Sequence, residues 1–244
     1  MYKSFSNIHI LREKTNNSSL RINTDCYFFS NLQCKTRDMM TKIIEKHNTE
    51  KQLPEKHPFE PFLPKNAKIL MLCSFPPPEK RWCMDFYYPN FGNDMWRIFG
   101  IIFFHDKDHF ITSNDSKRFF DKEKIIRFCK LKGIAMYDTA CEVIRLKDNA
   151  SDKFLEISKE TDVETLLQQI PECSAIITTG QKATEVLSGH FGCDIPQMGY
   201  YVCFNIGERT LRLYRLPSSS RAYPLALDKK AEKYKSMFID MGML

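Results

Sequence analysis

Two neighbouring segments of this chain carry residue types that suit the binding of a flat, polar ligand. In residues 74–78, a run of apolar residues gives way to Ser-Phe-Pro-Pro-Pro. The aromatic residues Phe86, Tyr87 and Tyr88 follow, and Asn93 comes just before a strongly apolar stretch. Aromatic rings and a neutral amide, with no histidine or carboxylate pair beside them, suit a planar, uncharged ligand such as a nucleobase. We therefore predict a ring-lined pocket beside a stiff loop.

The same residues also fit purely structural roles. Proline triplets commonly form rigid spacers, and tyrosines are commonly half-buried core residues. Asn93 suits the N-cap of the helix that follows, since Asn favours that position. The two roles of Asn93 are compatible, because a helix N-terminus aimed at a pocket also stabilises a departing anion. The place of residues 74–78, directly after the first buried strand, favours the functional interpretation.

A third segment, residues 216–221, reads Leu-Pro-Ser-Ser-Ser-Arg and follows a strand. Serine hydroxyls and backbone amides at a strand end can hold DNA phosphates without reading the base sequence. The same residues could equally form a plain turn. Arg209, Arg212, Arg215 and Arg221 are close together in the sequence. We give a solvated strand edge and a phosphate-contacting face equal weight for these arginines.

Composition excludes several classes of protein. The 244 residues are 43% hydrophobic and 27% charged, and no apolar run is long enough to span a bilayer. None of the nine cysteines has a C-x-x-C partner, which disfavours a zinc ribbon or an iron–sulfur cluster and favours the reducing cytoplasm. His105 and His109 have no obvious third ligand nearby, so we predict no metal site. The net charge of +6 is modest, so the distribution of charge matters more than its total.

Hydrophobic periodicity predicts alternating strands and helices after a polar start. The predicted strands are 68–73, 134–137, 175–179, 201–206 and 211–216, and the predicted helices are 93–104, 117–132, 161–170, 181–187 and 227–241. Such alternation favours an α/β fold with a mainly parallel sheet that is covered on both faces. In these sheets ligands bind beyond the carboxyl ends of the strands. Four loops, at 73–78, 138–142, 179–181 and 217–220, should therefore converge on one rim.

The first 56 residues differ from the rest of the chain. They are polar and rich in Asn, Lys and Ser, and four prolines separate them from the first buried strand. Met39 and Met40 could serve as alternative translation starts. We therefore expect residues 1–56 to be a polar, partly disordered N-terminal extension and residues 57–244 to be one domain.

Taken in order, the motifs resemble those of the uracil-DNA glycosylase superfamily. The order is a strand, S-F-P-P, Y-Y, N-x-x-W, a second strand that ends at Asp138, I-I-T-T-G-Q-K-A and finally L-P-S-S-S. The hypoxanthine-DNA glycosylases and the mismatch-specific uracil/thymine-DNA glycosylases are the most similar branches, and the resemblance covers most of residues 66–244. It implies a three-layer α/β/α sandwich around a four-stranded, mainly parallel sheet. It also implies hydrolysis of the N-glycosidic bond of a flipped base, without metal or cofactor.

The resemblance implies roles for residues of the first motif and the aromatic segment. Residues 73–77 take the place of the family's first motif, so backbone amides around Ser74 and Phe75 would donate to a base carbonyl. Tyr88 would be the ring on which the flipped base stacks. Asn93 would contact the base or orient the attacking water.

Further roles follow for carboxylates and for the second motif. Asp85 is a second catalytic candidate for polarising water, with Asp138 held in reserve as a more structural carboxylate. Residues 216–220 match the second motif, and Arg221 or Tyr223 would wedge into the gap left by the base. The expected DNA contacts are Ser218, Ser219, Ser220, Arg221 and Tyr223. The expected partner is DNA with a damaged or mismatched base, bound by a cytoplasmic monomer.

The chain departs from the family pattern at several positions. Phe75 stands where many members carry a water-positioning Asn or Asp, and Cys73 and Pro77 replace the motif's glycines. Leu216 replaces the usual His or Asn of the second motif. The hypoxanthine branch also lacks the first-motif amide. A residue outside the first motif would then have to carry out its part in catalysis.

Two hypotheses of different classes follow from these residues. The first is a DNA glycosylase of base excision repair that removes a deaminated or mismatched base, with uracil and hypoxanthine the foremost candidates. The second, favoured by Phe75, is a catalytically inactive nucleic-acid or nucleobase-binding module on the same fold. Hydrolysis of free nucleosides is disfavoured, because the arginine-rich strands would then have no polymer to grip.

Overall fold

The computed structural model describes residues 53–115, 117–147 and 152–244. Most of the expected extension, including Met39 and Met40, lies outside the described residues. The strand β1 (Glu55–Lys56) pairs with β6 (Ala140–Arg145), with Glu55 opposite Val143. Residues 55 and 56, which the sequence analysis assigned to the extension, therefore pair with a strand that follows residue 57.

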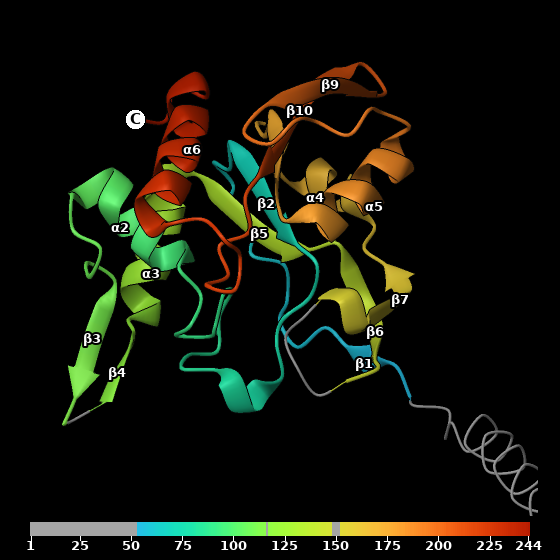
Figure 1. Cartoon of the computed structure of the whole chain (residues 1–244). Coiled ribbons are helices and arrows are strands. Elements are labelled where there is room, and N and C mark those ends of the chain that lie inside the picture. Colours follow the sequence, from blue (N-terminus) through green and yellow to red (C-terminus); the bar gives the residue numbers. More distant parts are fainter. Residues whose placement is uncertain (1–52, 116, 148–151) are drawn as a thin grey trace, which may run out of the picture. The chain divides into compact units, whose positions relative to one another are not determined.

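The central sheet has five strands in the order β5-β2-β8-β10-β9. Their bounds are β5 (Ile134–Asp138), β2 (Ile69–Cys73), β8 (Ala175–Thr179), β10 (Arg209–Leu216) and β9 (Tyr201–Ile206). The first four pair in parallel, and β9 pairs with β10 antiparallel. The expected four-stranded parallel sheet is thus present, with β9 added at one edge as the outer strand of a hairpin (Figure 1).

Helices cover both faces of this sheet, which confirms the three-layer sandwich (Figure 1). One layer holds α2 (Met95–Phe104), α3 (Lys122–Lys132) and α6 (Leu227–Asp240), and the other holds α4 (Val163–Gln169) and α5 (Gln181–Phe191). The five helices lie close to the positions that hydrophobic periodicity predicts for them.

The strand β2 shows why the sheet needs a layer on each side. Its residues alternate between two hydrophobic cores: Ile69 and Met71 pack with α2, α3 and α6, whereas Leu70 and Leu72 pack with α4 and α5. All four side chains are fully buried. Burying each side chain of this size contributes about 2 kcal/mol, so exposing either face of β2 would be costly. A continuous apolar run is the sequence pattern that such a strand requires.

The single helix predicted over residues 117–132 is wrong in its first part. Residues Lys117–Phe120 form β4, which pairs antiparallel with β3 (Ile111–Asn114). Asp121 then starts α3 as its N-cap, because its side chain accepts a hydrogen bond from the Lys124 N–H at 3.0 Å. The apolar Phe119 and Phe120 fit the helical period of residues 117–132, but the strand pairing and the cap decide the boundary.

A second, smaller sheet of β1, β6 and β7 (Leu155–Glu160) lies beside the first-motif loop and was not predicted. Phe75 packs into its small core with Ala140, Val143 and Leu155. Short 3₁₀ helices, η1 (Glu79–Arg81) and η2 (Asp152–Phe154), complete this region. Within the described part of the chain, no helix is long and apolar enough to cross a membrane.

Two glycines that end helices differ in how closely other atoms of the chain approach them. Gly133 ends α3 with φ +67°, and Gly192 ends α5 with φ +62°. A Cβ at Gly133 would clash with the Asn66 carbonyl oxygen, whereas a Cβ at Gly192 would meet nothing within 4 Å. We expect Gly192→Ala to lower the free energy of unfolding by about 1–2 kcal/mol, the cost of the left-handed conformation. Gly133→Ala should cost about 1–3 kcal/mol more, because backbone atoms must also shift.

Urea denaturation of both variants checks this prediction. Equal losses of stability at Gly133 and Gly192 would contradict the close approach of the α3–β5 turn to residue 66.

Candidate functional site

The carboxyl ends of β2 and β5 meet at a small cavity, which we call the ring-walled cavity. The space between its walls, open solvent included, is about 310 Å³. The walls are formed by rings and prolines, and two polar side chains face it. The lining residues are Phe59, Phe75, Tyr87, Tyr88, Pro76, Pro77, Pro89, Cys73 and Asp138. A cavity with flat apolar walls and one carboxylate suits a planar ligand that carries N–H donors.

Tyr88 is held rigidly in the wall of this cavity. Its hydroxyl shares a hydrogen bond with Thr179 Oγ1 at 3.2 Å, and its ring meets Trp96 edge-on at 6.1 Å. Burial raises its pKa well above the usual value, so the phenol stays neutral. Its φ of +52° is unusual for a residue with a side chain and is characteristic of functional sites, where surrounding contacts hold strained backbone. The structure thus brings Tyr88 to the cavity, as expected.

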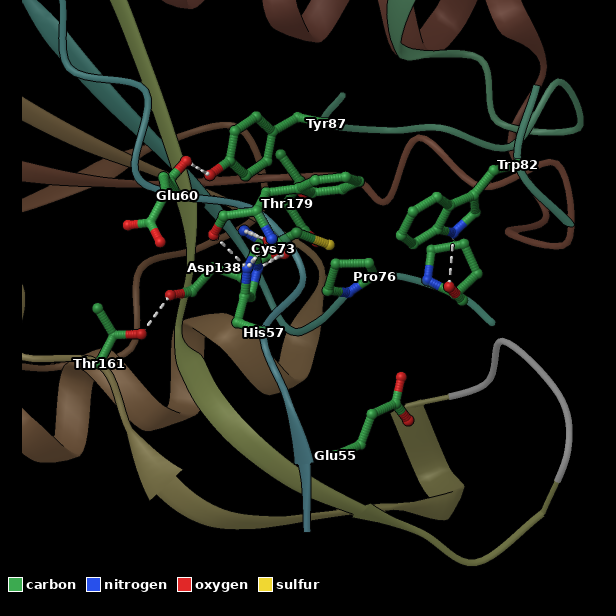
Figure 2. Close-up of polar contacts among 12 residues, drawn as sticks. Glu55, His57, Glu60, Cys73, Pro76, Trp82, Tyr87, Asp138, Thr161 and Thr179 are labelled. Atoms are coloured by element: carbon green, nitrogen blue, oxygen red, sulfur yellow. Dashed lines mark hydrogen bonds and ion pairs between the residues drawn. The ribbon is translucent and has the colours of Figure 1, made fainter. Parts of the chain in front are cut away.

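Asp138 is the carboxylate of the ring-walled cavity. Its Oδ1 accepts a hydrogen bond from the Cys73 N–H at 3.1 Å, and its Oδ2 accepts one from His57 Nε2 at 3.0 Å. Figure 2 shows these three residues gathered at the end of β5. Burial raises the pKa of Asp138, and the contacts with His57 and the Cys73 amide oppose that rise. Two donors leave lone pairs on both oxygens available to a ligand.

His57 is a site residue that the sequence did not reveal. It comes from the segment after β1 and reaches Asp138 across 81 residues of sequence. Its ring packs against Tyr137 at 4.5 Å and edge-on against Phe75 at 5.3 Å. Its Nδ1 lies 2.8 Å from the Phe59 carbonyl oxygen, which fixes the orientation of the ring. No local pattern around residue 57 signals this contact.

The first-motif loop is buried rather than exposed. Ser74 is 2% exposed, and its hydroxyl donates to Asp152 Oδ2 at 3.0 Å. Phe75 is 6% exposed and forms a wall of the ring-walled cavity. Trp82 Nε1 donates to the Pro77 carbonyl oxygen at 2.7 Å, which anchors the proline segment (Figure 2). Asp152 is a second partner that sequence analysis missed.

A larger groove runs beside the cavity, and we call it the basic groove. It encloses about 1680 Å³, open solvent included, and the described residues that line it include four cationic side chains and the carboxylate of Asp152. The cations are Arg81, Lys153, Arg215 and Arg221. Of the residues expected to contact DNA, Ser218, Ser220, Arg221 and Tyr223 line this groove. Ser219 does not, because it is buried at 2% exposure and its carbonyl oxygen accepts from the Asp94 N–H.

The four arginines that the sequence placed together do not form one face. Arg209 donates to the carbonyl oxygens of Leu167 and Cys173, and Arg212 pairs with Asp240 at 3.1 Å. Only Arg215 and Arg221 line the basic groove. The reason is strand length: each residue of β10 advances about 3.3 Å, so residues 209 and 212 lie far from the rim.

Asp94 joins the second motif to the start of α2. Its carboxylate lies 3.0 Å from Arg221 Nε, 3.6 Å from Lys230 Nζ and 3.7 Å from Arg97. Its backbone N–H donates to Ser219 at 2.9 Å. Asp94, Arg97 and Lys230 are all buried. The loop at residues 217–221 is therefore fixed by a group of buried charges rather than by loop packing alone.

The two residues expected to be catalytic lie outside the ring-walled cavity. Asn93 lies one residue before Asp94, which is the N-cap of α2. The Asn93 Oδ1 accepts from the Met95 N–H at 2.9 Å, and its backbone forms an isolated bridge with Ser220. Asp85 is exposed and pairs with Lys122 at 2.9 Å. The catalytic roles of Asn93 and Asp85 stay predictions from the sequence.

Metal ligation was also considered for the described residues. Within 53–115, 117–147 and 152–244, no group of three or more His, Cys, Asp or Glu side chains is arranged to hold a metal ion. His109 instead stacks on Phe104, with ring centroids 3.5 Å apart.

The fold is thus a three-layer α/β/α sandwich with a small, ring-lined cavity at the carboxyl ends of its parallel strands. No protein-family model matches the chain, and no curated protein matches it. Among solved structures, it is similar to the solution NMR structure of a "putative Uracil DNA glycosylase" from Methanosarcina acetivorans. The TM-score is 0.51 at 23% sequence identity, over 77% of this chain and 98% of that chain. This likeness shows a shared fold.

Asp94 offers a direct test of how the site is held together. Asp94→Asn keeps the shape of the side chain but leaves Lys230 and Arg97 buried without their carboxylate. We expect it to lower the free energy of unfolding by about 3–5 kcal/mol, the usual cost of breaking a buried ion pair. The control Asp85→Asn breaks an exposed pair and should cost no more than about 1 kcal/mol. Chemical denaturation of both variants measures the difference, and similar losses would contradict this role for Asp94.

Proposed function

We propose that this chain is a DNA glycosylase that accepts a flipped, deaminated base in the ring-walled cavity and hydrolyses its N-glycosidic bond. The observation that carries the proposal is the pairing of a ring-walled, carboxylate-bearing cavity with a basic groove at the same rim. In this proposal the flipped base would lie against the rings of the first, and the phosphates of a DNA strand would bind the cations of the second. The shared fold with the Methanosarcina protein supports the same class of activity.

The chemistry of Asp138 favours uracil and hypoxanthine as substrates. A carboxylate held by His57 and the Cys73 amide can accept a hydrogen bond from a ligand but cannot donate one while ionised. Uracil and hypoxanthine carry a ring N–H beside a carbonyl, whereas their parent bases cytosine and adenine carry an unprotonated ring nitrogen at the corresponding place. Thymine and guanine carry the same ring N–H, so Asp138 would distinguish a deaminated base from its parent base and not from these two. Tyr88 would stack on the base, and backbone amides near Ser74 and Phe75 would donate to its carbonyl oxygen.

Departure of the base builds positive charge on the sugar and negative charge on the base. Hydrogen-bond donors already held in place can stabilise that negative charge without a strong acid. Ser218, Ser220 and Arg221 would hold the flanking phosphates in the basic groove, with Tyr223 placed to enter the gap in the base stack. Asn93 would act by fixing the start of α2 beside the second motif. The biological role would be base excision repair.

One observation favours a second candidate, a catalytically inactive module that binds nucleic acid. Phe75 is an apolar wall where a water-positioning side chain would be needed, and Asp85 lies on the surface. Such a module would bind abasic or mismatched DNA and release no base.

Base release from labelled oligonucleotides tests the first proposal. Wild-type protein should release uracil, hypoxanthine or both, and should leave the undamaged bases in place. Tyr88→Ala should lower the single-turnover rate by about 10- to 100-fold, because stacking on an aromatic ring is worth about 1–3 kcal/mol per base. The matched variant Tyr88→Phe keeps the ring and loses only the bond to Thr179, so it should keep most of the activity. Full activity of Tyr88→Ala would contradict base stacking at this ring.

The basic groove makes a separate prediction about salt. Arg81 lines the groove and is exposed. Arg81→Ala should reduce the slope of log K against log salt concentration for oligonucleotide binding by about 0.7–0.9, the share of one phosphate contact. Lys235, exposed on α6 and outside the groove, supplies the control Lys235→Ala, whose slope should equal that of the wild type. Fluorescence anisotropy across a salt series measures both slopes. An unchanged slope for Arg81→Ala would show that Arg81 does not contact a DNA phosphate.

A further inference from the structure

We infer that Asp152 is the catalytic residue that polarises the attacking water, in the role that the side chain at Phe75 cannot fill. This inference rests on the proposed glycosylase function. It assigns a carboxylate that lies outside both sequence motifs and that comes from the segment between β6 and β7.

Asp152 is held in place through both its backbone and its side chain. Ser74 Oγ donates to Oδ2 at 3.0 Å, and Lys182 Nζ donates to the Asp152 carbonyl oxygen at 3.1 Å. Ser74 is 2% exposed, so this donor is fixed by the packing around the first motif. An ionised carboxylate has about four lone-pair sites, and among the described residues Ser74 is the side chain that donates to it, which leaves acceptor capacity for a water. The carboxylate is therefore oriented but not saturated.

The position of Asp152 matches the place where the sugar of a flipped nucleotide must lie. Its partner Ser74 is flanked by Cys73 and Phe75, and both of these line the ring-walled cavity. Asp152 itself lines the basic groove together with Ser218. With the base in the cavity and the phosphates in the groove, the deoxyribose spans the junction between them. A water bound to Asp152 at this junction would face the anomeric carbon of the sugar.

The electrostatic surroundings of Asp152 favour a role as a general base that accepts a proton from water. Burial raises the pKa of its carboxyl, whereas Ser74, Lys182 and Arg145 oppose that rise, and Asp138 adds to it. A carboxylate with a raised pKa is a stronger base, closer to the operating pH at which proton transfer is efficient. The other charged groups that line the same groove are Arg81, Lys153, Arg215 and Arg221.

Asp138 and Asp152 have different roles in the proposed reaction because their surroundings differ. Asp138 is tied to His57 inside the cavity and faces the base, whereas Asp152 lies in the groove and faces the sugar. In the reaction, the C1′–N bond breaks and its electron pair leaves with the base. The water oxygen forms the new bond to C1′, and the water proton passes to the Asp152 carboxylate. The base anion takes up a proton from solvent, and Asp152 later returns its own proton to solvent.

The experiment compares single-turnover base release and DNA binding for the wild type and Asp152→Asn across a pH series. The expected result is a rate loss of about 100-fold or more, the usual contribution of general base catalysis. Binding to an oligonucleotide that contains a non-hydrolysable analogue of the substrate nucleotide should stay within about threefold of wild type. Since only the ionised carboxylate accepts the proton, the wild-type rate should rise as pH rises through the pKa of Asp152, and this rise should vanish in Asp152→Asn.

Two further variants separate catalysis from folding. Ser74→Ala removes a contact that lowers the pKa of Asp152, so it should move the acidic limb of the pH profile to higher pH. Asp228→Asn changes an exposed acid on α6 and should leave rate and profile unchanged.

The possible outcomes are distinguishable. If the wild type releases base and Asp152→Asn keeps its rate and pH profile, Asp152 is not the base, and the proposed function stands without it. Equal losses of rate and binding in Asp152→Asn would assign the residue a structural role and overturn the inference. Absence of base release from every substrate by wild-type protein would overturn the proposed function and this inference together.

Discussion

Parallel pairing of β2 with β5 is the constraint on which the candidate site depends. The register places Cys73 opposite Asp138, so the first-motif loop starts beside the carboxylate of Asp138, which lines the ring-walled cavity. Pairing of β10 with β8 places Leu216 opposite Thr179, which brings the second motif to the same rim. Because the carboxyl ends of parallel strands lie at the same edge of the sheet, loops that are far apart in sequence meet there. Loss of this register would separate the cavity from the groove.

Buried charge is the second organising feature, and it has opposite consequences in two places. The Asp94 carboxylate offsets the burial of Lys230 and Arg97 and also pairs with the exposed Arg221, which locks the second motif to α2. At the rim, burial raises the pKa of Asp138 and of Asp152, which means that the fold disfavours their ionised forms. Carboxylates kept at such a cost are characteristic of functional sites rather than of stabilising interactions.

Much of the fold followed from the sequence because its signals are local. The apolar run of β2, the helical periods of α2 and α6, and the glycine that ends α3 each act within one element. The prediction failed where a local pattern had two solutions: residues 117–120 fit a helical period but pair as β4. The small sheet of β1, β6 and β7 was missed because its strands are half-exposed and short, so their apolar pattern is weak.

The candidate site likewise has some features that local sequence signals indicated and others that only the folded structure reveals. The sequence by itself indicated which loops meet at the rim, and it placed Tyr88 and Phe75 at a pocket, since both lie within one aromatic and proline-rich stretch. Only the tertiary structure decided which carboxylates belong there. His57 and Asp138 are 81 residues apart and Ser74 and Asp152 are 78 apart, so no local period links them. Strand register and burial make those contacts, and both are properties of the folded sheet rather than of any segment of the chain.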